Sequence, residues 1–280
     1  MVNAVTGENR TLVHLGLRCL IVDTIGVTIN TSANGIMLSQ NAKEKVRMKK
    51  LFIIGMLLLP SLVLANEKLE YELKVLGSEY GYASLYFDGS RAYGEIKANK
   101  KWSSVYNISN RIATVVNEGG YPTHTEFTYK FNKSQGHYKI DFENDKISVS
   151  KHAKGTTRKR FYKPKVDIHD MISWLAQVRI AVRENPDVPI VFKVFNGAKT
   201  YSVNCQPQKI EKLQTPIGEK TTKPYRITVT RSGDSTYKRE MRVWFNTTSN
   251  FEPLRLVGRF KVGYAEAIIT SLKSNDKEEK

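Results

Sequence analysis

Cysteine is scarce in this chain of 280 residues, which contains only Cys19 and Cys205. Cys19 lies in an N-terminal segment that is expected to be absent from the mature protein, for the reasons given below. Cys205 then has no partner, so the sequence offers neither a disulfide scaffold nor a cysteine-based metal site.

Acidic side chains are also few relative to basic ones. Lys and Arg number 44 against 27 Asp and Glu, which gives a formal net charge of +17 at pH 7. This excess favours anionic partners such as lipid headgroups, acidic glycans or nucleic acid. Hydrophobic residues make up 40% of the sequence, so the chain has enough apolar material for a core and is not disordered as a whole.

The apolar run Leu51–Leu59 is too short to cross a membrane, because a spanning helix needs about 20 apolar residues. Lys49 and Lys50 precede this run, and the small-residue site Val63-Leu64-Ala65 follows it, which is the pattern of an export signal. The sequence therefore predicts a signal peptide over 48–65, cleaved after Ala65, and a periplasmic mature protein without a stable transmembrane anchor. No cysteine follows the run, which excludes a lipoprotein anchor.

Residues 1–47 show no export pattern of their own, although a signal peptide should begin the chain. We interpret them as an over-extended reading frame, with Met48 as the true start. Removing residues 1–65 takes away seven basic and three acidic side chains and leaves a net charge of +13. An exported protein would rarely meet nucleic acid, so lipid, lipopolysaccharide or acidic glycan is the expected anionic partner.

Motifs of common enzymes are missing. The sequence has no G-x-S-x-G elbow, no phosphate-binding G-x-x-x-x-G-K-[ST] loop and no H-E-x-x-H helix. Four histidines follow the signal peptide, none paired with another at ligand spacing: His124, His137, His152 and His169. His169 with Asp167 and Asp170 is the nearest approach to an acid/base group, but helix capping explains these aspartates better. No catalytic residue, metal or cofactor is predicted.

Alternation of apolar and polar residues is frequent, as in Leu69 to Val75 and Phe127 to Phe131. This period of two indicates antiparallel strands with one buried face. About a dozen strands follow one another, and Asp88-Gly89 and Asn196-Gly197 predict hairpins with type I′ turns. The expected fold is mainly β: a large antiparallel, curved sheet or an open barrel. It forms a single domain over 66–273, followed by a polar tail at 274–280.

One helix is expected, over about 167–183. Its apolar residues recur at helical spacing, and Asp167 and Asp170 have the spacing of the N-cap and N3 positions, with Val166 and Met171 as a hydrophobic staple. Such a helix must bury its apolar stripe, so it should pack on the curved sheet or fill its mouth.

Four segments together are similar to a bacterial family, the domain of unknown function 3108. They are the opening LEYELKVLGSEYGYASLYF, the aspartate-led helix DIHDMISWLAQVR, the turn in IEKLQTPIG, and MRVWFNTTSNFEPLRL near the C-terminus. The resemblance covers nearly all of 68–272. It implies an exported, mainly antiparallel β fold, such as an open barrel similar to the periplasmic lipoprotein carriers, and it implies no reaction. Asn185-Pro186-Asp187 replaces the glycine expected after the helix.

The most unusual segment is KGTTRKRFYKPK, which places several cations close together: Arg158, Lys159, Arg160, Lys163 and Lys165. It is either an anion-binding patch or a solvated strand and loop.

The tryptophans either line a ligand cavity or fill the core: Trp102, Trp174 and Trp244.

The sequence thus favours a non-enzymatic periplasmic binding or carrier protein for an amphipathic or anionic ligand, either a lipid or an envelope polysaccharide. An assembly or structural factor of the cell envelope, docking on a protein partner, is the alternative. A hydrolase of envelope polymers is the third hypothesis.

Overall fold

The computed structural model of the chain describes residues 66–103, 107–164, 167–260 and 263–274. The predicted signal peptide, the segment 1–47 and all but the first residue of the predicted tail lie outside the described residues. The strands are β1 (Glu67–Val75), β2 (Ser78–Phe87), β3 (Arg91–Ala98), β4 (Ile108–Val116), β5 (Pro122–Phe131), β6 (Ser134–Phe142), β7 (Ile147–Ala153), β8 (Thr156–Tyr162), β9 (Ile190–Phe195), β10 (Thr200–Pro207), β11 (Glu211–Thr215), β12 (Gly218–Arg231), β13 (Asp234–Asn246), β14 (Pro253–Phe260) and β15 (Gly263–Ser274). The helices are α2 (Lys100–Ser103) and α3 (Ser173–Glu184).

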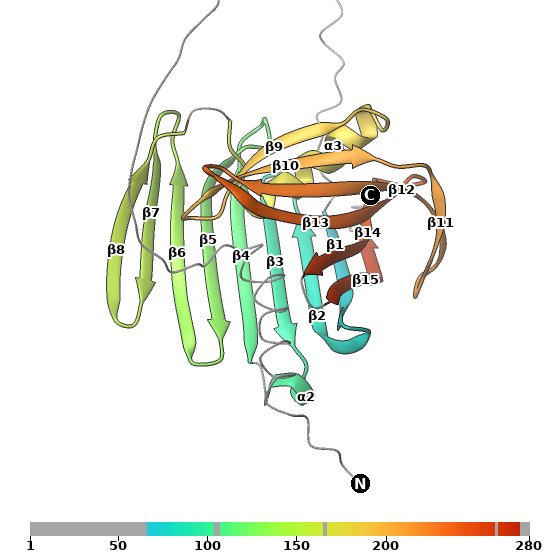
Figure 1. Cartoon of the computed structure of the whole chain (residues 1–280), viewed down its shortest axis with the longest axis horizontal. Coiled ribbons are helices and arrows are strands. Elements are labelled where there is room, and N and C mark those ends of the chain that lie inside the picture. The colour runs from blue at the N-terminus through green and yellow to red at the C-terminus, as the bar shows by residue number, and fades with distance from the viewer. Residues whose placement is uncertain (1–65, 104–106, 165–166, 261–262, 275–280) are drawn as a thin grey trace, which may run out of the picture.

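All of these strands belong to one antiparallel sheet, as predicted. The strand order is β8-β7-β6-β5-β4-β3-β2-β1-β15-β14-β13-β12-β10-β9, and β11 pairs with β12 beside this path. The first strand β1 therefore pairs with the last strand β15 in the middle of the sheet. The end strands β8 and β9 do not pair with each other, so the sheet is curved but not closed into a barrel. In Figure 1, strands β2 to β8 form a long wing, and β9 to β13 bend across one end of it.

The predicted alternation positions the core. On β1, Leu69, Tyr71, Leu73 and Val75 are buried while the residues between them are half-buried or exposed. Because side chains along a strand point alternately to opposite faces, these four residues lie on one face. The helix packs on this face.

The helix α3 packs between two arms of the curved sheet. One arm contains β1 and the wing, and the other is formed by β9 to β13. Ile172, just before α3, and Ala176 on it share a core cluster with Leu69, Tyr71 and Phe87 of β1 and β2. On the other arm, α3 contributes Leu175, Val178 and Val182 to a second cluster. The strands β9, β10, β12 and β13 supply the rest of it: Val194, Val203, Cys205, Tyr225, Ile227, Val243 and Phe245. The helix thus packs on the curved sheet, as the sequence predicts.

The start of this helix was predicted wrongly. It begins at Ser173, not at Asp167. The main chain of His169 is already paired with β9, since its N–H donates to the carbonyl of Lys193 at 2.8 Å and its carbonyl accepts the N–H of Phe195 at 2.8 Å. Residues held in this extended pairing cannot take helical dihedral angles, so the helix must begin later.

Asp170 caps the helix in place of Asp167. Its Oδ1 accepts the N–H groups of Ile172 at 3.0 Å and Ser173 at 2.6 Å, and its own N–H donates to Ser173 Oγ at 3.0 Å. This reciprocal pair satisfies donors that the first helical turn leaves free. Val166, the other half of the predicted staple, lies outside the described residues.

Both predicted hairpins are present, but their turns are not of type I′. That type needs positive φ at both central residues, and only the glycines have it, at 66° for Gly89 and 86° for Gly197. The pairs Leu76-Gly77 (52° and 78°) and Lys154-Gly155 (51° and 74°) have positive φ at both positions instead. Neither pair carries the asparagine or aspartate that marks such turns, which is why the sequence did not reveal them.

The structure also adds elements that the sequence did not predict. It has fifteen strands among the described residues, against about a dozen expected. It also has the one-turn helix α2, where Asn99 Oδ1 accepts the N–H of Trp102 at 3.1 Å.

Cys205 is a free cysteine in strand β10, as predicted, and its side chain is fully buried. Burial raises the pKa of this thiol to about 12, so it stays protonated in the folded protein.

Candidate functional site

The predicted basic segment forms β8, the strand at one end of the sheet (Figure 1). Thr156 to Phe161 are all exposed, and only Tyr162 is half-buried. Lys163 follows the strand and is exposed, while Lys165 lies outside the described residues. A strand with almost no buried position depends on its neighbour, so β7 and the turn before β8 determine its place.

The pairing with β7 divides the cations between two faces. Arg158 lies opposite Lys151, and Arg160 lies opposite Val149. Val149 belongs to the core cluster that contains Phe195, so its side chain is on the inner face of the wing. Arg158 and Arg160 therefore share this inner face with Lys151. Lys159 lies on the outer face. The structure therefore adds Lys151 to the predicted patch and separates Lys159 from it.

Aromatic side chains lie beside these inner cations. The Lys151 ammonium is 5.0 Å from the ring centroid of Tyr138, and the rings of Tyr129 and Tyr138 are 6.0 Å apart. Tyr162 makes an edge contact at 4.9 Å with Phe195 of the opposite arm. Burial raises the pKa of Tyr138 to about 12, and nearby Arg160 opposes that rise. The inner face of β5 to β8 thus changes from apolar to aromatic to cationic toward the edge of the sheet.

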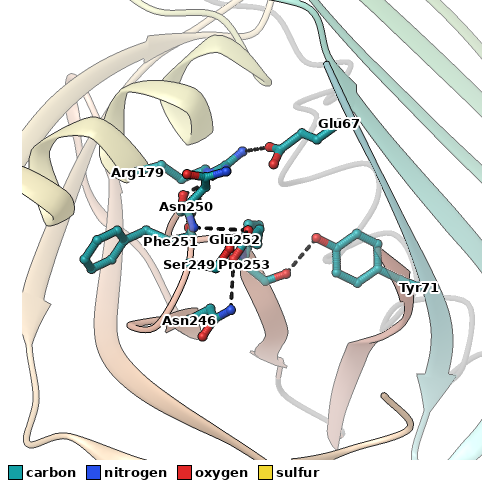
Figure 2. Close-up of polar contacts among 9 residues, drawn as sticks. All are labelled: Glu67, Tyr71, Arg179, Asn246, Ser249, Asn250, Phe251, Glu252 and Pro253. Atoms are coloured by element: carbon teal, nitrogen blue, oxygen red, sulfur yellow. Dashed lines mark hydrogen bonds and ion pairs between the residues drawn. The ribbon is translucent and has the colours of Figure 1, made fainter. Parts of the chain in front are cut away.

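A second group of polar side chains joins the helix to the sheet (Figure 2). Arg179 of α3 points toward Glu67 of β1, and the two form an ion pair in which each side chain is at most 3% exposed. The guanidinium also donates to the carbonyl oxygens of Asn250 at 2.9 Å and Phe251 at 3.2 Å. Its positive charge and its N–H groups are therefore satisfied inside the protein, which is the condition for burying an arginine.

The same group holds the loop between β13 and β14. Glu252 accepts hydrogen bonds from Asn246 Nδ2 at 3.0 Å, Ser249 Oγ at 2.8 Å and the Asn250 N–H at 3.2 Å. The Tyr71 hydroxyl donates to the carbonyl of Pro253 at 2.7 Å (Figure 2). Burial raises the pKa of Tyr71 well above its usual value. Helix, first strand and C-terminal loop are thus joined by polar contacts that are already paired, so this group serves the fold.

Two sequence signals indicate that Arg179 and Glu67 are each buried. Arg179 lies on the same helical stripe as Leu175 and Val182, which are buried. Glu67 has the same strand phase as Leu69 and Tyr71. A charged residue in a buried phase needs a buried partner, but the sequence does not show that these two are partners.

A third group surrounds the segment before α3. Oδ2 of the buried Asp170 accepts hydrogen bonds from the hydroxyls of Thr114 and Thr125, which lie opposite each other on β4 and β5. The neighbouring His169 ring is stacked on Tyr121 at 4.9 Å and meets Phe192 edge-on at 5.4 Å. Asp170 therefore ties the helix start to the wing, a structural role.

His169 is buried, with Nδ1 lacking a hydrogen-bond partner in the described part of the chain. Burial lowers its pKa below 6.5, and Asp170 and Asp167 oppose that shift. The unfolded chain takes up a proton near pH 6.5 while the folded one stays neutral, so stability is full above that pH and falls as the pH drops. Replacing His169 with phenylalanine, which preserves the ring contacts, should remove this part of the pH dependence in urea unfolding between about pH 7 and pH 5. An unchanged pH dependence would contradict the assignment.

The three tryptophans lie in different parts of the molecule. Trp102 is on α2, with Nε1 donating to the Glu79 carbonyl at 2.7 Å. Trp174 is on α3, with Nε1 donating to the Met171 carbonyl at 3.1 Å. Trp244 is on β13, where Nε1 donates to Glu211 at 2.5 Å. The structure does not bring them together, and each indole N–H is already bonded within the protein.

The described residues contain no group of three or more His, Cys, Asp or Glu side chains that could hold a metal ion. In the same part of the chain, no helix is long and apolar enough to cross a membrane.

Comparison with known families supports the resemblance noted above. The family DUF3108, proteins of unknown function, matches residues 70–270. The chain belongs to this family. The match spans β1 to β15, so it includes the wing, α3 and the loop of Figure 2, and the DUF3108 domain is the whole curved sheet. None of the curated proteins matches the chain.

The chain is also similar to solved structures. A β-barrel-like protein of the domain of unknown function DUF1849 from Brucella abortus has a TM-score of 0.56 and 12% identity, covering 76% of this chain and 99% of that one. Weaker matches are a candidate lipoprotein from Parabacteroides distasonis (TM-score 0.28, 10% identity, 75% and 95% covered) and a candidate exported protein with a YmcC-like fold from Bacteroides fragilis (0.29, 8%, 76% and 97%). The first match shows that the DUF3108 chain shares a barrel-like fold.

Proposed function

We propose that this protein is an exported, non-enzymatic binding or carrier protein, which holds an amphipathic anion on the inner face of β5 to β8. The observation that carries the proposal is the row of Lys151, Arg158 and Arg160 beside Tyr138 and Tyr162 on that face. An acyl or ring portion would pack on the tyrosines, and a phosphate or carboxylate would pair with the cations. The anionic lipid of an envelope membrane has both parts.

The signal-peptide pattern over 48–65 supports the cellular setting of this proposal. Cleavage after Ala65 would release a mature chain that begins one residue before Glu67, the first residue of β1 and the partner of Arg179. The proposed cleavage site thus leaves the fold complete. In the periplasm, the protein would meet lipid and envelope polysaccharide and not nucleic acid.

The test is binding of the mature chain to phosphatidylcholine vesicles that contain phosphatidylglycerol. Each Lys or Arg close to an anionic surface contributes about 1 kcal/mol, so Arg158→Gln with Arg160→Gln should weaken partitioning on the order of 10- to 30-fold and flatten its salt dependence. The matched control, Lys130→Gln with Lys159→Gln, removes the same charge from exposed residues on the outer face. An equal loss of vesicle binding in both variants would show that the basic segment is only a solvated charged face.

A second comparison separates lipid from polysaccharide. Tyr162→Ser removes an aromatic surface but no charge. We expect it to weaken vesicle binding and to leave binding of a soluble acidic polysaccharide, such as alginate, unchanged. If both losses are equal or absent, the tyrosines do not contribute to an amphipathic site.

A further inference from the structure

The free edge of β8 contrasts with the other end of the sheet. The end strand β9 is partly covered, because His169 pairs in parallel with Val194. The main chain of His169 donates to the Lys193 carbonyl and accepts the Phe195 N–H. Within the described residues, β8 pairs with β7 alone. Unpaired main-chain groups of an edge strand form a template for another strand.

The turn before β8 determines which groups face outward. Lys154-Gly155 forms a two-residue type I′ turn, so Ala153 and Thr156 are a hydrogen-bonded pair. Such pairs alternate along antiparallel strands, so Arg158 and Arg160 direct their main-chain groups to β7. Thr157, Lys159 and Phe161 therefore direct their N–H and C=O groups away from the sheet.

The charges on this edge select the partner. Arg158, Lys159 and Arg160 make no ion pair with any carboxylate in the part of the chain that the structure describes. The neighbouring strand β7 has no acidic residue. On β6 and just after it, Asp141 is 2.6 Å from His124, and Glu143 is 3.1 Å from Lys146.

A second copy of this chain is a poor occupant. Antiparallel pairing of two β8 strands about Lys159 would bring Lys159 opposite itself and Arg158 opposite Arg160, and like charges placed directly opposite destabilise a sheet. Acidic residues in the same positions would pair with these cations. Phe161, 67% exposed on the outer face, would add an apolar contact.

We propose that β8 binds an extended acidic segment of a partner protein, which joins the sheet as an added strand. The outward groups of Thr157, Lys159 and Phe161 supply its main-chain hydrogen bonds. Carboxylates on alternate residues lie on one face of the added strand, where they pair with Arg158 and Arg160 on the inner face. The residues between them lie on the outer face, beside Lys159 and Phe161. The hydrogen-bonding groups of this surface are on the main-chain edge of β8, whereas the lipid is proposed to pack on the tyrosine face; the two sites share Arg158 and Arg160.

The experiment uses the mature chain and a synthetic peptide that alternates glutamate with valine, with binding measured by fluorescence anisotropy. We expect binding, with hydrogen-exchange protection of the Thr157, Lys159 and Phe161 amides. Lys159→Pro removes an outward N–H but no bond to β7, and proline is tolerated at such edge positions. It should weaken peptide binding about tenfold or more, whereas Lys159→Gln, which keeps the N–H, should weaken it less.

A peptide N-methylated on alternate residues tests the same bonds without changing the protein, so the proposal does not depend on the folding of the proline variant. Failure of the wild-type chain to bind the glutamate peptide, or equal binding of the N-methylated one, would overturn the proposal. The Lys159→Pro variant keeps Arg158 and Arg160 and should still bind anionic vesicles as Lys159→Gln does. Its vesicle binding therefore separates failure of this proposal from failure of the lipid site.

Discussion

Replacing Arg179 with leucine is expected to lower the free energy of unfolding by about 3–5 kcal/mol, measured by urea denaturation. The substitution leaves the Glu67 carboxylate buried without its partner. It also frees the carbonyl oxygens of Asn250 and Phe251, which accept from the guanidinium. Breaking a buried pair costs far more than losing a surface pair, because the remaining charge stays desolvated.

Two controls separate the ion pair from the helix itself. Arg183→Leu makes the same change at an exposed position of α3 and should change stability by less than about 0.5 kcal/mol. Adding Glu67→Leu to Arg179→Leu should recover part of the loss, since the unpaired charge is gone. If the double variant is as unstable as the sum of two large single losses, the two residues act independently and the assignment is wrong.

Asp170→Ala is the second large expected loss, again about 3–5 kcal/mol. The substitution removes the cap of α3 and the acceptor for the two threonine hydroxyls, and hydrogen bonds to a charged group contribute about 1.5–3 kcal/mol each before overlap. Asp170→Asn keeps an oxygen for the helix N–H groups and should cost less. Thermal and urea unfolding monitored by tryptophan fluorescence would measure both.

Asp167→Ala is the matched control for this substitution. Asp167 is exposed, and the helix begins after it, so the change should cost less than about 0.5 kcal/mol. The sequence pattern assigned the cap to Asp167. A larger loss at Asp167 than at Asp170 would favour the sequence assignment over the structure.

Features governed by local period were predictable. The alternation of Leu69, Tyr71 and Leu73 fixes the buried face of β1 because strand geometry alone places them together. The antiparallel class follows from the same pattern and from short turns. The fold class therefore needed no knowledge of which strands meet.

Features governed by contacts between distant segments were not predictable. Glu67 and Arg179 are 112 residues apart, so neither reveals the other without the strand order. The start of α3 depends on the pairing of His169 with β9, which overrides the local capping pattern at Asp167. The candidate basic patch was visible in the sequence, but its division into an inner and an outer face, and the addition of Lys151, required the β7–β8 register.

The pairing of β1 with β15 also has a bearing on how the chain folds. Glu70 and Thr270, joined by a hydrogen bond across this seam, are 200 residues apart. The hairpins of β2 to β8 can form from neighbouring segments, but the middle of the sheet must wait for its last strand, and such long-range pairing is slow. Until then, β1 is an unpaired edge rich in apolar side chains, exposed to aggregation. The twelve residues of β15 therefore control whether an unfolded chain reaches its native state before it meets another unfolded chain.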